Sequence, residues 1–175
     1  DTIIVYVTDN GWIQNPEKNG YAPRSKQTPY EGGIRTPIMF SWPNGKLKNG
    51  KRKDVVSSID LFPTVLAATG ARTPKGLPGL NLLENLKNEK PLKRKGILGE
   101  SFAHDIADVE NPEESLIFRW TIEGKWKLLL TYDGEVNRYK TTHPREEKRP
   151  QLFNLLDDPK EEKNLAEQNP KVVAR

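Results

Sequence analysis

The chain opens on an apolar, β-branched run, TIIVYV at residues 2–7, that leads directly into the sequence TDNG. A continuous run of this kind predicts a strand that is apolar on both faces, and hence one buried in a parallel or mixed sheet. Two interpretations of TDNG are open. Asn-Gly beside apolar residues favours a tight hairpin turn. Asp9 and Asn10, at the end of a buried strand, instead offer two oxygen ligands to a hard metal ion.

A long polar connection separates this run from the next apolar segment. Residues 9–36 are rich in Gly, Pro, Asn and charge and show no period, which predicts a loop. Loops of this length are usually functional or disordered. PIMFSW at residues 37–42 predicts a second buried strand. In open α/β sheets, ligands bind beyond the carboxyl ends of strands, which is where Asp9 and Asn10 fall.

The remaining residues predict helices first and an antiparallel sheet later. Residues 57–69 predict the clearest helix, with Ser58 or Asp60 as its cap and Gly70 as its stop, and an amphipathic segment follows near 81–87. Four later segments predict strands, and the middle two form a hairpin: 96–102, 116–122, 125–132 and 151–155. We therefore expect an α/β portion in residues 1–90 and a small α+β subdomain with a four-stranded antiparallel sheet in residues 91–175.

Composition excludes several kinds of site. The 175 residues include no Cys, so disulfides, Cys-ligated metals and a Cys nucleophile within the chain are excluded. No apolar stretch reaches the roughly 18 residues of a membrane span. The net charge is only +4 and the signs are mixed, so nucleic acid is not an expected partner. The basic run at residues 46–53 favours a solvated loop over a surface that steers anions.

A second polar segment, RSKQTPYEGGIRTP at residues 24–37, adds cations and close-approach glycines. An ammonium such as that of Lys26 belongs near a divalent cation only if an anion bridges the two, and sulfate and phosphate esters are the obvious anions. Taken singly, each feature has an ordinary explanation: a turn, a surface lysine, or a bend before a strand. Their order and spacing together favour a site.

Five motifs in this order resemble the C-terminal half of the type I sulfatases, the formylglycine-dependent members of the alkaline phosphatase-like superfamily. They are TDNG (8–11), Lys26 four residues before YEGGIRTP (30–37), VSSIDLFPTVL (56–66), WTIEGKWKL (120–128) and LFNLLDDPKEEKNL (152–165). The resemblance covers nearly the whole chain. It implies a partial alkaline phosphatase-like sheet with helices, plus a small C-terminal antiparallel α+β subdomain.

The resemblance also implies a mechanism. Sulfatases are hydrolases that cleave sulfuric esters with a formylglycine nucleophile, assisted by a Ca²⁺ ion bound by four oxygen-donor residues; Mg²⁺ is the alternative ion. Asp9 and Asn10 match two of these metal ligands, and Lys26 matches the catalytic lysine that contacts the sulfate. His104, with Asp105 beside it, falls in a region that faces the substrate pocket in similar sulfatases. The implied substrates are sulfated carbohydrates or aryl sulfate esters.

The chain departs from the family pattern in three respects. It has no Cys or Ser followed by x-Pro-x-Arg, no Asp-Asp pair for the other two metal ligands, and no His upstream of Asp9. We therefore expect a fragment, with the formylglycine in a missing N-terminal half, that is inactive alone and binds Ca²⁺ at roughly millimolar concentration or more weakly. Two alternatives stay open: a related phosphoester or phosphonate hydrolase, and a non-catalytic binding module.

The other expectations concern surroundings and partners. His143 lies in a charged loop and is expected to be solvated, and Trp120 is expected in the core rather than as a sugar platform. The buried strands would expose apolar faces and open edges in isolation, which predicts self-association or a covering partner. From the resemblance alone we expect a periplasmic or secreted protein, although no signal sequence is visible.

Overall fold

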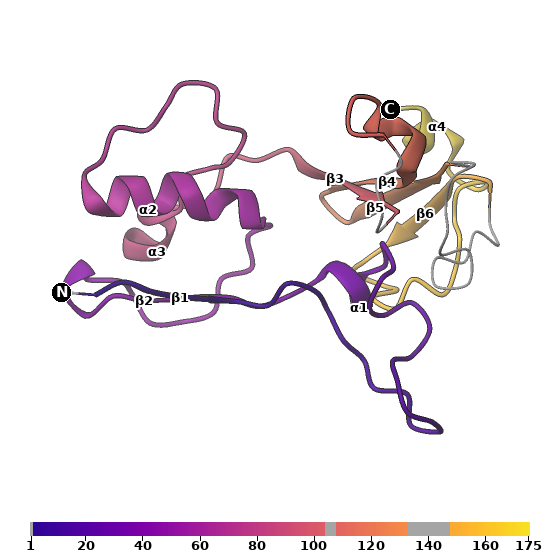
Figure 1. The fold of residues 1–175 in the computed structure, drawn as a ribbon, viewed down its shortest axis with the longest axis horizontal. Coiled ribbons are helices and arrows are strands. Elements are labelled where there is room, and N and C mark those ends of the chain that lie inside the picture. The colour runs from indigo at the N-terminus through magenta and orange to yellow at the C-terminus, as the bar shows by residue number, and fades with distance from the viewer. Residues whose placement is uncertain (1, 104–107, 133–147) are drawn as a thin grey trace. The chain divides into compact units, whose positions relative to one another are not determined.

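The computed structural model describes residues 2–103, 108–132 and 148–175, and the order of its elements can be followed in Figure 1. The helices and strands are β1 (Ile4–Val7), α1 (Glu31–Ile34), β2 (Ile38–Ser41), α2 (Leu61–Thr69), α3 (Leu83–Asn88), β3 (Gly96–Phe102), β4 (Leu116–Glu123), β5 (Trp126–Thr131), β6 (Gln151–Asn154) and α4 (Pro170–Ala174). The mixed α/β class is confirmed. None of the helices in the described residues is long and apolar enough to cross a membrane.

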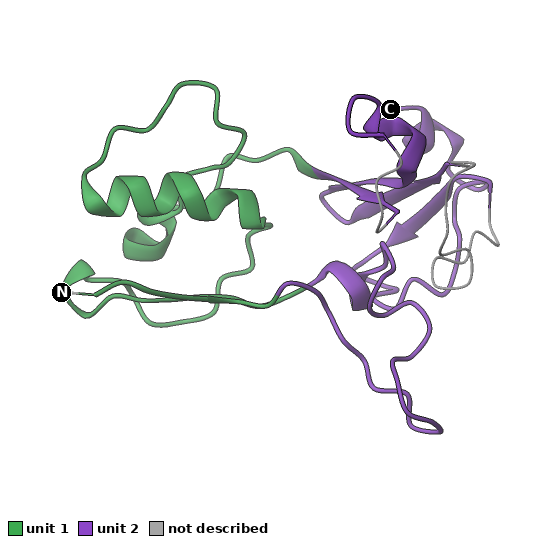
Figure 2. Ribbon diagram, viewed as in Figure 1, with its two compact units in different colours: residues 1–8, 36–97 green, residues 9–35, 98–175 purple. Residues whose placement is uncertain are grey.

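The chain divides into two compact units (Figure 2). The first contains residues 1–8 and 36–97, and the second contains residues 9–35 and 98–175. The segment 9–35, which we expected within the α/β portion, thus belongs with the C-terminal residues. The reason is that its helix, α1, makes a buried ion pair with Lys127 of β5 and donates a backbone hydrogen bond to Glu161, after β6.

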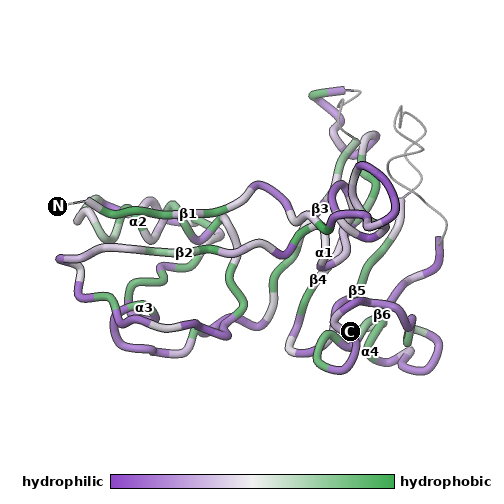
Figure 3. The backbone as a smooth tube through the Cα atoms, turned by 90° about the horizontal axis from the view of Figure 1, so that it is seen from below, coloured by the Kyte–Doolittle hydropathy of each residue, from purple (hydrophilic) through white to green (hydrophobic). Residues whose placement is uncertain are grey.

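In the first unit, β1 and β2 pair in antiparallel register, with Tyr6 opposite Met39 and Val5 opposite Phe40. Our prediction of a parallel or mixed sheet buried on both faces is wrong for the described residues. One face of this two-stranded sheet is open: the exposed fraction is 51% for Tyr6 and 53% for Met39. Figure 3 shows the hydrophobic character of β1. An apolar run specifies that both faces prefer burial, but it does not specify what covers them.

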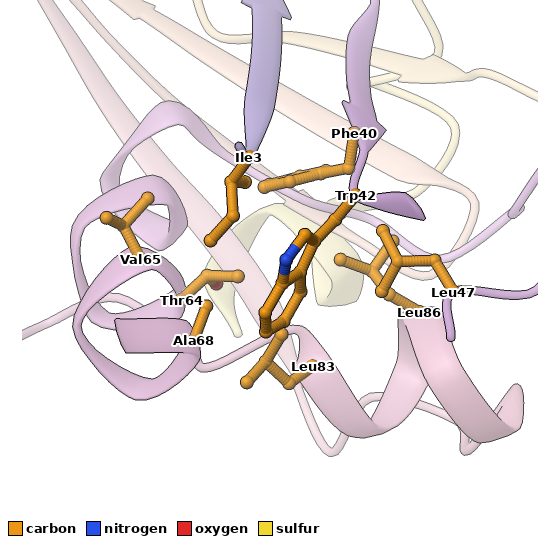
Figure 4. A pocket seen from close by; sticks show the side chains of 9 residues that line it. All are labelled: Ile3, Phe40, Trp42, Leu47, Thr64, Val65, Ala68, Leu83 and Leu86. Carbon is orange, nitrogen blue, oxygen red and sulfur yellow. The ribbon is translucent and has the colours of Figure 1, made fainter. Parts of the chain in front are cut away.

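The other face of this sheet packs on helices. Figure 4 shows apolar side chains from the strands, α2 and α3 converging around a small pocket. The residues that line it are Ile3, Phe40, Trp42, Leu47, Thr64, Val65, Ala68, Leu83 and Leu86. The helix predicted at 57–69 begins as a 3₁₀ turn at Ser58–Asp60, continues as α2 and ends at Gly70 with φ of 73°. The N-cap of the 3₁₀ turn is Ser57 and not the predicted Ser58. Asp60 stands at the N-cap position of α2 without a side-chain cap bond, and it completes a capping box by accepting the Ser57 N–H at 2.8 Å.

Asp60 also carries a buried carboxylate that accepts several hydrogen bonds within the first unit. Its side chain is fully buried, and its two oxygens accept hydrogen bonds from both terminal nitrogens of Arg94, at 2.5 and 2.8 Å. Oδ1 also accepts the Leu80 N–H at 2.7 Å. A buried carboxylate is stable only with such a full set of partners. Asp60 therefore joins the start of α2 to the two segments that follow it in the chain.

The second unit is built on a four-stranded sheet of order β3-β4-β5-β6. The β4–β5 and β5–β6 pairs are antiparallel, and the β4–β5 hairpin turns at Gly124, whose φ is 59°. All four predicted strands are present. The core of the described residues is apolar and includes Ala103, Ile117, Phe118 and Leu129, with Tyr30 and Trp120 packed against it. Trp120 is therefore a packing residue, as expected.

Candidate functional site

Glycines hold the segment that follows β1 against α1. The Gly11 N–H donates to the Gly33 carbonyl at 2.7 Å. A Cβ atom on Gly11 would lie 2.3 Å from the Gly32 carbonyl oxygen, which is closer than non-bonded atoms approach. Only glycine permits this backbone crossing. The predicted role of the Gly-Gly pair, close approach of the backbone, is thus found between two parts of the chain.

The loop that carries Lys26 packs on the same glycine pair. A Cβ on Gly33 would lie 2.3 Å from the Thr28 carbonyl oxygen and 2.4 Å from that of Ser25. Ser25 is fully buried, and its hydroxyl accepts the Ile13 N–H at 2.5 Å. Gly33 is therefore the point at which the TDNG segment and the Lys26 loop meet.

Lys26 lies beside the residues that follow Asn10. Its ammonium nitrogen is 5.3 Å from the ring centre of Trp12, within the range of a cation–π contact. Asp9, Asn10 and Lys26 therefore belong to one compact unit, although Asn10 and Lys26 are 16 positions apart in sequence. His104 and Asp105, the expected pocket residues, and His143 lie outside the described residues.

Asp9 and Asn10 present oxygen atoms of the type that hard cations prefer. Asp9 is exposed, and its Oδ1 accepts the Asn10 N–H at 2.9 Å. The Asn10 side-chain amide donates to the Gly11 carbonyl at 2.9 Å, which fixes that side chain and leaves its carbonyl oxygen as an acceptor. A carboxylate and an amide oxygen suit Ca²⁺ or Mg²⁺, which take six or more oxygen ligands. In the described part of the chain, no group of three or more His, Cys, Asp or Glu residues could hold a metal ion. These two residues thus fit the ion in chemistry and supply only part of a coordination shell.

The hairpin interpretation of TDNG does not hold. A short hairpin does follow, but it begins later: Gln14 bridges Tyr21, and the Ala22 N–H donates to the Ile13 carbonyl at 2.7 Å. Asn10 and Gly11 precede that hairpin and do not form its turn. Asn-Gly is therefore not used as a hairpin turn here.

A buried cluster of charged side chains contacts the first residue of α1. Lys127 is fully buried in the sheet, and its ammonium lies 2.8 Å from Glu161 Oε1 and 3.2 Å from Glu31 Oε1. The Glu31 N–H donates to Glu161 Oε2 at 2.5 Å. Burial raises the pKa of Glu161, and the neighbouring Lys127 ammonium opposes that rise. This cluster fixes the first residue of α1, directly before Gly32 and Gly33 in sequence.

Arg24 and Tyr30 secure the two ends of the Lys26 loop. The Arg24 guanidinium lies 4.7 Å from the Tyr30 ring centre and donates to the Glu161 backbone carbonyl. The Tyr30 hydroxyl donates to the Gln151 side chain at 2.9 Å, and its ring meets that of Phe153 edge-on. The loop is thus anchored to β6 and to the segment that follows it.

Sequence reasoning did not assign roles to Glu31, Lys127 or Glu161. One signal was available for Lys127. In an antiparallel strand, alternate residues share a face, so Lys127 lies on the same face as the fully buried Leu129. A lysine at an inward position needs an anionic partner. The sequence does not reveal which two carboxylates supply it, because they lie 96 and 34 residues away.

Comparison with known proteins finds sulfatases. Residues 1–71 match the family model described as Sulfatase. A sulfatase from Formosa agariphila is 28% identical over 97% of this chain and 30% of its own length. An N-acetylgalactosamine-6-O-sulfatase from Bacteroides thetaiotaomicron is 28% identical over 99% of this chain and 34% of its own. The chain thus spans about a third of the length of these relatives.

Solved structures agree on the fold. A putative sulfatase from Bacteroides thetaiotaomicron superposes with a TM-score of 0.70 at 21% identity, over 98% of this chain and 33% of that one. The fold of this chain is that of the matching third of the sulfatase structure. The residues that contain Asp9, Asn10 and Lys26 thus match the sulfatase family model, and nearly the whole chain is similar to proteins named as sulfatases.

Proposed function

We propose that this chain supplies part of the metal and sulfate site of a sulfuric ester hydrolase. The observation that carries the proposal is the meeting of the TDNG segment and the Lys26 loop at Gly33. In its support, the segment with two hard oxygen donors and the loop with one ammonium both contact the same glycine of the second unit. Such a combination suits a sulfate or phosphate monoester whose oxygen atoms bridge a cation and a lysine.

Each residue has a distinct role in this proposal. Asp9 and Asn10 bind Ca²⁺, or Mg²⁺ in its place, through one carboxylate and one amide oxygen. The bound ion supplies positive charge to the sulfate oxygens. Lys26 donates hydrogen bonds to the sulfate group and neutralises negative charge that develops on it and on the leaving oxygen. The Trp12 ring lies 5.3 Å from this ammonium and offers it a cation–π contact. The nucleophile, a formylglycine in this family, is not among the residues of this chain.

Sulfated carbohydrates are the proposed substrates, because a relative that matches nearly the whole chain is named for a 6-O-sulfated N-acetylgalactosamine. Aryl sulfates serve as convenient probes of the same chemistry. An exported location, periplasmic or secreted, is part of the proposal and is based on the family resemblance.

The test uses the complete natural polypeptide that carries these residues. We expect hydrolysis of 4-nitrophenyl sulfate, a much slower rate with 4-nitrophenyl phosphate, and loss of both activities on chelation of divalent cations. K26M should lower kcat/KM by about 10²–10³-fold, the usual effect of removing one donor from a developing anion. K18M, which removes an exposed lysine of the same segment, should not change kcat/KM.

A second variant tests the metal role. D9N should raise the Ca²⁺ concentration needed for half-maximal activity about tenfold or more, because affinity follows the charge of the ligands. Preference for the phosphate ester would favour a phosphoester hydrolase. Binding of sulfated glycans without turnover would favour a non-catalytic module.

A further inference from the structure

Glu161 contacts both ends of the segment that carries Lys26. Its backbone carbonyl accepts a hydrogen bond from the Arg24 guanidinium, and its carboxylate accepts the Glu31 N–H at 2.5 Å. The exposed fraction of Glu161 is 1%. Its backbone φ is 58°, a conformation that residues other than glycine rarely adopt. One buried residue, 130 positions from Glu31, thus binds the beginning and the end of this loop.

We propose that Glu161 is a positioning residue for Lys26, and that Lys127 holds the Glu161 carboxylate in place for this role. This inference rests on the proposed function, because Lys26 is the group through which Glu161 would act. Glu161 itself touches neither Lys26 nor, in the proposal, the substrate. Its effect on the reaction passes through Arg24 and Glu31.

The loop needs such an external anchor. Arg24 and Gln27 both have positive φ, at 56° and 65°, and Lys26 lies between them. Residues held in this region cost free energy, and they persist only where the surroundings over-determine the backbone. The Lys26 side chain is long and flexible, so the position of its ammonium group can be no better defined than the position of its backbone. A rigid backbone is therefore required for a charge that must meet a small anion.

The charges around Glu161 explain why an ionised glutamate fits this position. Lys127 and Arg24 supply two positive charges, and Glu31 and Glu161 supply two negative charges. A buried carboxylate of this kind is stable only while its partners remain. Glutamine has the same shape and can still accept the Glu31 N–H, but it leaves Lys127 with one carboxylate fewer. E161Q thus weakens the anchor with the least change in packing.

The first measurement is hydrogen–deuterium exchange in the complete natural polypeptide, and it does not depend on any activity. We expect E161Q to speed amide exchange in residues 24–33 by about tenfold or more, because local opening becomes easier. The matched control is E162Q, which changes the adjacent, exposed glutamate and should leave exchange in this segment unchanged. Equal exchange in E161Q and the wild-type protein would overturn the proposal.

The second measurement is a double-mutant cycle on kcat/KM for an aryl sulfate. With Lys26 present, E161Q should lower kcat/KM by about 10- to 100-fold, the order of effect expected from misplacing a group by an ångström. In the K26M background, E161Q should cost less than about twofold, because the group it positions is already gone. A merely structural role would give the same loss in both backgrounds, and that result would overturn the proposal.

Failure of the proposed function is recognised separately. A wild-type protein that hydrolyses no sulfate ester would overturn the proposed function, and with it the catalytic meaning of Glu161, whatever the exchange data show. If E161Q does not fold, R24K tests the same anchor, because it removes the fork that reaches the Glu161 carbonyl. R24K should then give the same faster exchange in residues 24–33 and the same non-additivity with K26M.

Discussion

Adding a single methyl group at Gly11 should move the TDNG segment away from the Lys26 loop. In G11A the new Cβ would lie 2.3 Å from the Gly32 carbonyl oxygen, about 1 Å short of ordinary van der Waals contact. The obstacle is backbone, so no side-chain rotation relieves it. The chain must separate, and the hydrogen bond from the Gly11 N–H to the Gly33 carbonyl, now 2.7 Å, should be lost.

The magnitude follows from two contributions. Crowding of this kind costs about 1–3 kcal/mol of unfolding free energy. The lost hydrogen bond adds about 0.5–1.5 kcal/mol. Because Asp9 and Asn10 would move about 1 Å relative to the Lys26 loop, kcat/KM should fall by about 10²-fold. The assays are chemical denaturation and hydrolysis of 4-nitrophenyl sulfate by the complete natural polypeptide.

The control is G124A, in the β4–β5 turn. A Cβ there meets nothing within 4 Å, but the φ of 59° disfavours alanine. This strain should cost about 1–2 kcal/mol of stability. Since Gly124 contacts no part of the site, kcat/KM should not change. Wild-type kcat/KM in G11A, or equal losses of kcat/KM in G11A and G124A, would refute the reasoning.

Two further predictions concern pH and self-association. The Asp158 carboxylate accepts the N–H groups of Glu162 and Lys163, at 3.0 and 2.9 Å. Burial acts to raise the pKa of Asp158, but these bonds outweigh it and lower that pKa below 3.8. The ionised Asp158 therefore stabilises the folded protein above pH 3.8, and this stabilisation is lost as the pH falls through the folded-state pKa. D158N should therefore destabilise the protein at pH 7, and its difference from wild type in urea denaturation should shrink as the pH falls below 3.8. The 175-residue chain alone should self-associate through the open apolar face around Tyr6 and Met39, which are 51% and 53% exposed. The double variant Y6K/M39K should therefore have a lower sedimentation coefficient than the wild-type chain. A monomeric wild-type chain would contradict this prediction.

Local sequence signals predicted most of the elements, because those signals act over a few residues. The β4–β5 hairpin follows from alternation around Glu-Gly, and α2 ends at Gly70 as its sequence indicates. The short helix α1 was not predicted. Its four residues include two glycines, which disfavour helix, and external contacts to Glu31 hold it instead.

Pairing partners were harder to predict than elements. TIIVYV indicated a strand correctly, but its apolar character on both faces suggested neighbours that the described residues do not provide. The candidate site shows the same limit. Asp9, Asn10 and Lys26 could be named because their motifs are local, whereas the carboxylates that neutralise Lys127 are set by tertiary contacts alone.

The discontinuity of the second unit links the site to the C-terminal residues. Residues 9–35 hold the candidate ligands, yet the anchors of that segment, Lys127 and Glu161, come from the far end of the chain. Closing such long loops costs entropy before any contact is gained, so the segment cannot be ordered early by local interactions. The buried ion pairs compensate once the sheet has formed, because an unpaired Lys127 in that position would be strongly unfavourable. Formation of the candidate site is therefore coupled to completion of the C-terminal sheet, and truncation after β5 should disorder residues 24–33 even though it removes none of Asp9, Asn10 and Lys26.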